Sequence, residues 1–183
     1  GIDGKNARQL TWCGGAGAGG SCQYAAWSPD GKWLAVQRLG AQSFLLDASQ
    51  PWQAQTPLEL PTLPAADNHF LAWVWSPDSR ELAGWQRNVN GLEGGLWVYT
   101  LATQRYERLT NVGIEPHWLK DQRRLIYRDQ RRLWLFDRNT RQITETLRLD
   151  PMGVTKAVLS PDNRQLYFSQ IDSDADLWLL KLP

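Results

Sequence analysis

The stretch that decides the fold is Trp75-Ser76-Pro77-Asp78-Ser79-Arg80-Glu81-Leu82-Ala83-Gly84. Near-copies of it begin at Trp27 and Leu159, and a degenerate copy without the proline begins at Trp118. The four starting points lie roughly 40 to 50 residues apart, a spacing typical of propeller blades that contain four strands each. The repeat therefore predicts a β-propeller.

Each residue type in the repeat suits a tight turn. Proline presets φ at about −65°, and the serine before it can bond nearby backbone groups, so Ser-Pro begins the turn. The aspartate that follows is expected to cap the turn through its carboxylate. The next residue, which is Gly31, Ser79 or Asn163, is expected in the left-handed region, which glycine and asparagine tolerate better than serine.

We expect an all-β chain that folds as a β-propeller of four visible four-stranded blades, because no helical periodicity of useful length appears. Residues 1–183 would form one propeller domain or a fragment of one. Its blades are predicted at about 23–60, 70–109, 114–148 and 155–182. The third strand of each blade is apolar on both sides, which is typical of strands buried between neighbours. In the first blade the fourth strand is predicted at 54–60.

The two ends of the chain indicate how the last blade is completed. This blade shows only three strands, and residues 5–11 form one expected strand without a blade. We expect residues 5–11 to pair with residues 176–182. Pairing within one chain would close the ring, and pairing between two chains would make a homodimer. Either arrangement removes open strand edges, which otherwise promote association.

Composition narrows the function classes. The formal net charge of +1 over 183 residues argues against direct contact with nucleic acid. No apolar run approaches the roughly 20 residues of a membrane span, and no secretory signal is present. The chain begins at Gly1 rather than methionine, so we expect a piece of a longer protein, with any membrane contact made by an upstream segment. The eleven tryptophans are expected to pack between blades.

Two cysteines, Cys13 and Cys22, flank the glycine-rich residues 14–21. We expect them to form a disulfide, which would stabilise the fold by about 2–3 kcal/mol in the chain-entropy model. Such a bond would indicate an oxidising compartment. The alternatives are two unpaired thiols on a flexible loop, or a phosphate-binding glycine loop. The second alternative lacks the Lys-Ser/Thr ending and the following helix.

No metal or cofactor site is expected. His69 and His117 occupy similar places beside expected strands, but a metal site needs three or four convergent ligands. The alternating carboxylates Asp172, Asp174 and Asp176 resemble the start of a calcium loop, yet the required glycine and the final glutamate are missing. A solvated hairpin loop is the simpler interpretation, with weak calcium binding as the alternative.

The segment 120–148 contains nine basic and four acidic residues. The predicted strands divide these arginines between the two ends of the third blade, whereas a nucleic-acid site needs them in one stripe. One end holds Arg123, Arg124, Arg138 and Arg141, and the other holds Arg128, Arg131 and Arg132. We take Arg128, Arg131 and Arg132 as a candidate interaction surface. Arginine–carboxylate pairs between blades are the alternative.

The repeats resemble TolB-type propeller repeats of the Trp/Phe-Ser-Pro-Asp-Gly variety, which are related to the WD class, over nearly the whole chain. The stretch from Tyr167 to Trp178 is similar to the terminal blade of CadC-like winged-helix transcriptional regulators. In those proteins a DNA-binding domain is joined, often through one transmembrane helix, to a C-terminal propeller. The resemblance implies that this chain is the sensing half.

We therefore expect a non-enzymatic sensing or protein-interaction propeller, the C-terminal periplasmic part of a bacterial membrane-bound transcriptional regulator. Blade-end loops would bind a protein partner or a small ligand. The alternative is a TolB-like accessory or ligand-binding domain of a larger enzyme, such as a kinase or peptidase. The chain contains no Gly-x-Ser-x-Gly elbow of a hydrolase, so no catalytic residues are assigned.

The disulfide expectation can be tested by counting thiols on denatured, unreduced protein. A Cys13–Cys22 bond gives no reactive thiol before reduction, and both thiols after it. Two reactive thiols per chain before reduction would contradict the bond and weaken the assignment to the periplasm.

Overall fold

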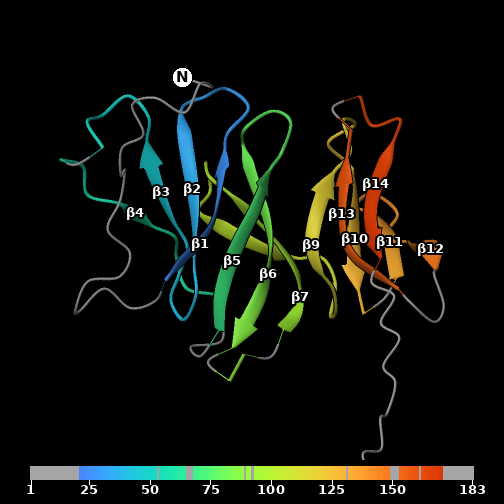
Figure 1. The fold of residues 1–183 in the computed structure, drawn as a ribbon. Helices are drawn as coiled ribbons and strands as arrows, with labels where there is room; N and C mark the ends of the chain where they lie inside the picture. Colours follow the sequence, from blue (N-terminus) through green and yellow to red (C-terminus); the bar gives the residue numbers. More distant parts are fainter. Residues whose placement is uncertain are drawn as a thin grey trace, which may run out of the picture.

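The structure, a computed structural model, describes residues 21–52, 54–64, 68–88, 90–91, 93–130, 132–148, 153–160 and 162–170. These residues form an all-β chain with three four-stranded antiparallel sheets and one two-stranded sheet (Figure 1). None of the described residues belongs to a helix, so no described helix could span a membrane.

The sheets follow the sequence repeat and are here called blades 1 to 4. Blade 1 contains β1 (Cys22–Trp27), β2 (Trp33–Arg38), β3 (Phe44–Asp47) and β4 (Leu58–Glu59). Blade 2 contains β5 (Asn68–Trp75), β6 (Glu81–Asn88), β7 (Glu93–Thr100) and β8 (Arg105–Arg108). Blade 3 contains β9 (Ile114–Trp118), β10 (Arg124–Asp129), β11 (Arg132–Asp137) and β12 (Ile143–Arg148). Blade 4 contains β13 (Val154–Leu159) and β14 (Leu166–Gln170).

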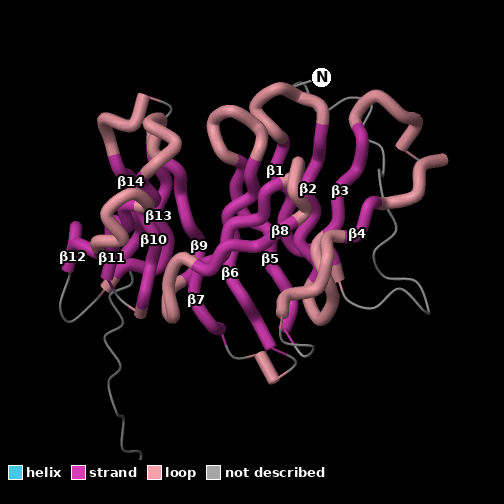
Figure 2. The backbone as a smooth tube through the Cα atoms, turned by 180° about the vertical axis from the view of Figure 1, so that it is seen from behind, coloured by secondary structure: helices cyan, strands magenta, loops and turns pink. Residues whose placement is uncertain are grey.

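Strands pair in sequence order within each blade, and the blades lie side by side in the same order (Figures 1 and 2). This antiparallel order gives the molecule two ends. The Ser-Pro-Asp turns lie at the turn end, which is uppermost in Figure 1. The β2–β3, β6–β7 and β10–β11 connections lie at the opposite hairpin end, together with the segments that cross from one blade to the next.

The Ser-Pro-Asp turn is built by one repeated set of hydrogen bonds. In blade 2 the backbone N–H of Ser76 donates to the Glu81 carbonyl at 2.8 Å, and the Ser79 N–H donates to the Ser76 carbonyl at 2.9 Å. The Ser76 hydroxyl donates to the Asp78 carboxylate at 2.6 Å and accepts from the Glu81 N–H at 2.9 Å. The Asp78 carboxylate also accepts the Arg80 N–H at 3.2 Å, which confirms its predicted capping role.

Blade 3 keeps the same turn without the serine. The Leu119 N–H still donates to the Arg124 carbonyl at 2.8 Å. Because Leu119 has no hydroxyl, Asp121 takes its place: one carboxylate oxygen accepts the backbone N–H groups of Arg123 and Arg124, both at 3.0 Å. The degenerate copy of the repeat therefore forms an equivalent turn with a different acceptor.

The left-handed position predicted for each turn is confirmed. The residue there has φ of +73° at Gly31, +63° at Ser79, +57° at Gln122 and +59° at Asn163. Glycine suits this region at no steric cost, and asparagine tolerates it. In two turns this residue also reaches the preceding blade, since the Ser79 hydroxyl accepts the Asp30 N–H at 3.0 Å. The Asn163 amide oxygen likewise accepts the Lys120 N–H at 2.5 Å.

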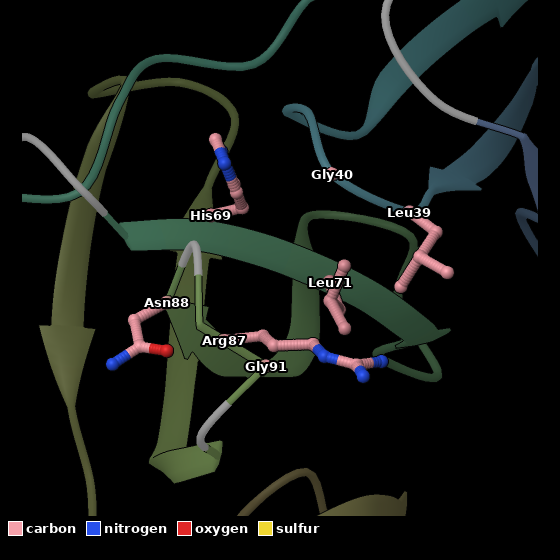
Figure 3. Close-up of a pocket in the computed structure, with 7 residues that line it drawn as sticks. All are labelled: Leu39, Gly40, His69, Leu71, Arg87, Asn88 and Gly91. Carbon is pink, nitrogen blue, oxygen red and sulfur yellow. The ribbon is translucent and has the colours of Figure 1, made fainter.

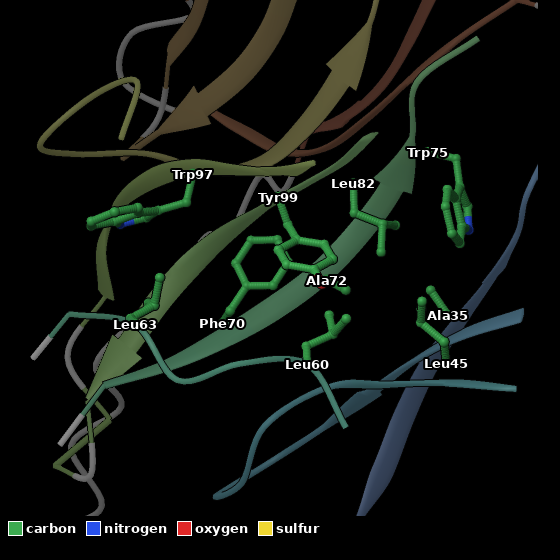
Figure 4. Close-up of a cluster of buried hydrophobic side chains, with 10 residues drawn as sticks. All are labelled: Ala35, Leu45, Leu60, Leu63, Phe70, Ala72, Trp75, Leu82, Trp97 and Tyr99. Atoms are coloured by element: carbon green, nitrogen blue, oxygen red, sulfur yellow. The ribbon is translucent and has the colours of Figure 1, made fainter. Parts of the chain in front are cut away.

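Apolar side chains hold neighbouring blades together. Between blades 1 and 2 they form one buried cluster (Figure 4): Ala35, Leu45, Leu60, Leu63, Phe70, Ala72, Trp75, Leu82, Trp97 and Tyr99. Within β7 the residues alternate, because Trp97 and Tyr99 belong to this cluster while Leu96 and Val98 face blade 3. The third strand β7 is therefore buried on both faces, as predicted, whereas the third strand expected in blade 4 lies outside the described residues. The Trp75 indole N–H also donates to the Ala26 carbonyl of blade 1 at 2.9 Å.

One strand prediction needs correction. The fourth strand of blade 1, expected over 54–60, is only β4 at Leu58–Glu59. The Gln55 side chain accounts for the difference, because its amide accepts the Asp47 N–H at 2.7 Å and donates to the Asp47 carbonyl at 3.1 Å. A side chain thus occupies the backbone groups that a longer strand would use. Residues 5–11 and 176–182, and with them the closure of the ring, lie outside the described residues.

Trp118 and Trp27 occupy the same repeat position. They are therefore a matched pair for measuring how much packing between blades contributes to the free energy of unfolding. Trp118 is 6% exposed, whereas Trp27 is 52% exposed. We expect Trp118→Ala to lower the free energy of unfolding by roughly 3–5 kcal/mol, and Trp27→Ala to lower it by about 1 kcal/mol or less. Urea unfolding measures both. Equal losses would show that burial between blades does not determine the stability of the repeat.

Candidate functional site

The hairpin end contains two clefts at corresponding places, one between blades 1 and 2 and one between blades 2 and 3. The first cleft has a volume of about 200 Å³ and the second about 280 Å³. The first is lined by Leu39, Gly40, His69, Leu71, Arg87, Asn88 and Gly91. The second is lined by Glu93, Val112, Gly113, Ile114, Arg128, Asp129 and Gln130. Each cleft is therefore formed by strand ends together with the connections between strands.

Arg87 is the charged residue of the first cleft. It lies opposite His69 in the β5–β6 ladder, but Figure 3 shows its side chain extended toward Leu71 and Leu39, with the His69 ring pointing away from it. At the hairpin, Gly91 has a φ of +79°, and a Cβ atom built there would lie 3.3 Å from the Arg87 guanidinium. The lack of a side chain at Gly91 therefore leaves room for the guanidinium.

An ion pair lies beside the second cleft. The Arg128 guanidinium donates to the Glu115 carboxylate at 3.3 Å, and both side chains are largely buried. Gly113 allows the chain to pass close to the Tyr127 ring beside this cleft. Its φ is +100°, and a Cβ atom there would lie only 2.3 Å from the Tyr127 ring. Any side chain at position 113 would therefore displace the Tyr127 ring.

Each innermost strand carries one extra residue that the pairing skips. The register shifts fall between Cys22 and Tyr24 in β1, between Ala72 and Val74 in β5, opposite Ile126 and Arg128 in β9, and between Val154 and Lys156 in β13. A bulge of this kind turns side chains away from the regular alternation. The four inner strands therefore all present residues that are not fixed by pairing.

The bulges bring an aromatic and acidic group together at the inner strands. The ring of Tyr24 stacks on Trp73 with centroids 4.0 Å apart, and Trp73 meets Trp85 edge-on at 5.3 Å. Burial and the negative charge of Glu115 raise the pKa of the Tyr24 hydroxyl. The charge of Glu115, on blade 3, thus acts on blade 1. Tyr24 remains 38% exposed, so this inner cluster is open to solvent.

The arginines predicted as an interaction surface are only partly free. Arg128 is paired with Glu115, and Arg132 donates to the Glu145 carboxylate at 3.2 Å. Arg131 lies outside the described residues. Arg128 and Arg132 do lie at the hairpin end, so their predicted separation from the other arginines of blade 3 is observed. A role in binding a partner stays a prediction.

The opposite end shows the carboxylate pairs that the sequence offered as an alternative. The Arg138 guanidinium of blade 3 donates to Glu81 at 2.7 Å and to Glu107 at 2.6 Å, both in blade 2. It also lies over the Trp118 ring at 5.5 Å from its centroid. Arg141 donates to Glu107 at 2.8 Å. These contacts join blades 2 and 3 at the turn end and pair Arg138 and Arg141 with carboxylates.

The two histidines do not occupy similar places, which corrects the sequence prediction. His69 is the second residue of β5, at the hairpin end, and its Nδ1 atom is buried without a hydrogen-bond partner in the described chain. His117 is the fourth residue of β9 and bonds the backbone of Ala157 in blade 4. The difference follows from their distances to the repeat anchor, because His69 lies six residues before Trp75 and His117 lies one residue before Trp118.

Other predicted features are only partly visible. Cys22 is disulfide-bonded, but Cys13 lies outside the described residues, so the Cys13–Cys22 bond stays a prediction. Asp172, Asp174 and Asp176 also lie outside them. Across the described ranges no group of three or more His, Cys, Asp or Glu residues is placed to hold a metal ion.

No known protein family and no curated protein matches the chain. Among solved structures it is similar to a putative TolB from Agrobacterium tumefaciens, with a TM-score of 0.51 and 16% identity over 85% of this chain and 72% of that one. It is similar to the β-propeller domain of Cps50 (Swd1) from Myceliophteria thermophila, with a TM-score of 0.62 and 15% identity over 84% of this chain and 55% of that one.

The chain is also similar to an oligogalacturonate lyase in complex with manganese, with a TM-score of 0.67 and 16% identity over 89% of this chain and 49% of that one. The extracellular domain of a putative one-component system from B. thetaiotaomicron gives a TM-score of 0.57 and 13% identity over 82% of this chain and 20% of that one. The chain thus spans about half the length of the Swd1 domain and of the lyase.

These similarities, together with the repeated blades, define the class: the chain has a β-propeller fold. Its relatives in fold include TolB-like and Swd1-type propellers and one extracellular domain of a signalling system. At such low identity the likeness extends to the fold alone. Because one neighbour is a lyase, the fold does not by itself separate a binding domain from an enzyme.

His117 gives a prediction about pH. Burial lowers its pKa below 6.5, although Glu115 and the bond to Ala157 act in the opposite direction. As pH falls through 6.5, the unfolded chain binds a proton that the folded chain does not, so stability should fall until pH reaches the lowered pKa. Above about pH 7 the residue is neutral in both states and stability should be constant.

The measurement is the urea midpoint between about pH 7.5 and 5.5, above the range in which carboxylates titrate. We expect the His117→Gln variant to lose part of the decline seen in the parent chain. Identical pH profiles for the two proteins would show that His117 is not the source of the decline.

Proposed function

We propose that this propeller is a non-enzymatic sensing or protein-interaction module that binds its ligand or partner at the hairpin end. The observation that carries the proposal is the pair of clefts, which lie at corresponding places between successive blades and contain Arg87 and Arg128. Apolar walls with a few convergent polar groups are typical of ligand sites. The turn end also contains a cleft, within blade 1 beside Gly31, Trp33 and Asp47, but where blades meet it is occupied by hydrogen bonds and ion pairs between them.

In the finer form of the proposal, the chain is the C-terminal, periplasmic part of a membrane-bound transcriptional regulator. Three observations support this context. The end of the chain resembles the terminal blade of CadC-like regulators, one fold neighbour is the extracellular domain of a one-component system, and Cys22 is disulfide-bonded, which suits an oxidising compartment. Direct contact with nucleic acid would then belong to an upstream domain.

A second candidate is an accessory or ligand-binding domain of a larger enzyme. The similarity in fold to an oligogalacturonate lyase favours an enzymatic setting. In this case the hairpin end would hold a substrate for a catalytic group outside the described residues. Pairing of residues 5–11 with 176–182 between chains would make either form a homodimer.

The test is a thermal-shift screen of the chain against amino acids, amines, organic acids, sugars and divalent cations. We expect at least one compound to raise the Tm, because a ligand that binds only the folded state stabilises it. The effect should weaken in Arg87→Gln or in Arg128→Ala, according to the cleft that the compound occupies, but persist in Arg123→Ala. Arg123 is the matched control, since it forms an ion pair with Asp137 in the same blade, at the turn end.

A screen in which no compound shifts the Tm would count against small-ligand sensing at this end. A shift that all of these variants retain would place the ligand elsewhere. For the second candidate, the chain is incubated with oligogalacturonate and manganese, and the unsaturated product is followed by its ultraviolet absorbance. Formation of that product would overturn the non-enzymatic proposal.

A further inference from the structure

Arg87 lacks the partner that comparable arginines have. Most of the partly buried arginines in the described chain pair with a carboxylate: Arg38 with Glu59, Arg128 with Glu115, Arg132 with Glu145, and Arg138 with Glu81 and Glu107. Arg87 is also partly buried, yet within the described ranges its guanidinium makes neither a hydrogen bond nor an ion pair. A partly buried guanidinium without a counter-charge is unfavourable, so Arg87 lacks an anionic partner.

The described chain does not supply the missing charge. The acidic residue nearest in the ladder is Glu93, which lies opposite Arg87 on β7. Its side chain is exposed and lines the second cleft instead. The seven residues that line the first cleft include no carboxylate. An anion that pairs with Arg87 would therefore come from a bound molecule.

The surroundings of Arg87 limit what that molecule can be. A guanidinium presents two parallel N–H donors, which match the two oxygens of a carboxylate. Next to it lie Leu39 and Leu71 (Figure 3), and Leu71 is only 2% exposed. A volume of about 200 Å³ is below the range of roughly 300–1,000 Å³ that drug-sized ligands occupy. The cleft thus suits a small body with one charged end and one apolar end.

We propose that the first cleft binds a short aliphatic carboxylate, with its two oxygens on the Arg87 guanidinium and its carbon chain against Leu39 and Leu71. This inference deepens the proposed function, because it names a ligand class for one of the two clefts at the hairpin end. Gly91 contributes by leaving room beside the guanidinium. Glu93 contributes by keeping its own carboxylate in the other cleft.

The experiment is a titration of the 15N-labelled chain with sodium butyrate at constant ionic strength, followed by NMR. Butyramide serves as the uncharged probe of the same shape, and inorganic phosphate as an anion without an apolar body. We expect saturable shifts of the Leu39, Gly40 and Gly91 amides and of the Arg87 Nε–H with butyrate. Butyramide and phosphate should bind at least about tenfold more weakly.

Variants assign the effect to Arg87. Arg87→Gln keeps a polar side chain of similar length and should weaken butyrate binding at least about tenfold. Arg105→Gln is the matched control, because Arg105 is an exposed arginine of the same blade at the turn end, and it should bind butyrate as the parent does. If Arg87→Gln fails to fold, the Arg87 Nε–H signal of the parent chain still reports the contact directly.

Several results would overturn the inference. These are equal affinity for butyrate and butyramide, tighter binding of phosphate, an unchanged Arg87 Nε–H, or no saturation with any carboxylate. A failure here leaves the proposed function standing if the thermal-shift screen finds another ligand that depends on Arg128. The absence of binding in both the titration and the thermal-shift screen would count against the hairpin end as a binding site.

Discussion

The hydrogen-bonded turn between the first two strands of each blade is the constraint on which the rest of the structure depends. A serine hydroxyl that donates to an aspartate and accepts a backbone N–H fixes both the reversal and the register of the strands that follow. Where leucine replaces serine in blade 3, the aspartate accepts two N–H groups and the geometry is retained. Because the turn sets which residues alternate, it also sets which side chains lie between blades.

This register gives the turn end and the hairpin end of the molecule different roles. Contacts at the turn end join blades through Ser79, Asn163 and the Arg138 network. At the hairpin end the connections between strands differ from blade to blade, and the two clefts between blades lie there. A partner or ligand that binds at the hairpin end does so without replacing contacts that hold the blades together. The proposed sensing role relies on this separation.

Four features could be predicted from the sequence, because each follows from a local pattern. They are the blades, the left-handed turn positions, the two-sided burial of the third strand and the separation of the arginines into two groups. The shortness of β4 was missed, since it depends on the Gln55 side chain bonding to Asp47, a choice that propensity does not reveal. The similarity expected for His69 and His117 was wrong because they lie six residues and one residue, respectively, before the tryptophan that starts the repeat. Arg87 was overlooked for a different reason: an arginine without a partner is recognised only when its neighbours are known.

The bulges in the four inner strands have a consequence for how such a module can diversify. An extra residue that takes no part in the ladder can change identity without altering the pairing on either side of it. Trp73 and Glu115 fall within two of these irregular stretches, and both act on Tyr24 of blade 1, Trp73 by stacking and Glu115 by its charge. The chemical character of a bulge residue can therefore change without altering the pairing of the strands. Duplication of a blade, followed by substitution at one such position per repeat, would give new binding selectivity on an unchanged scaffold.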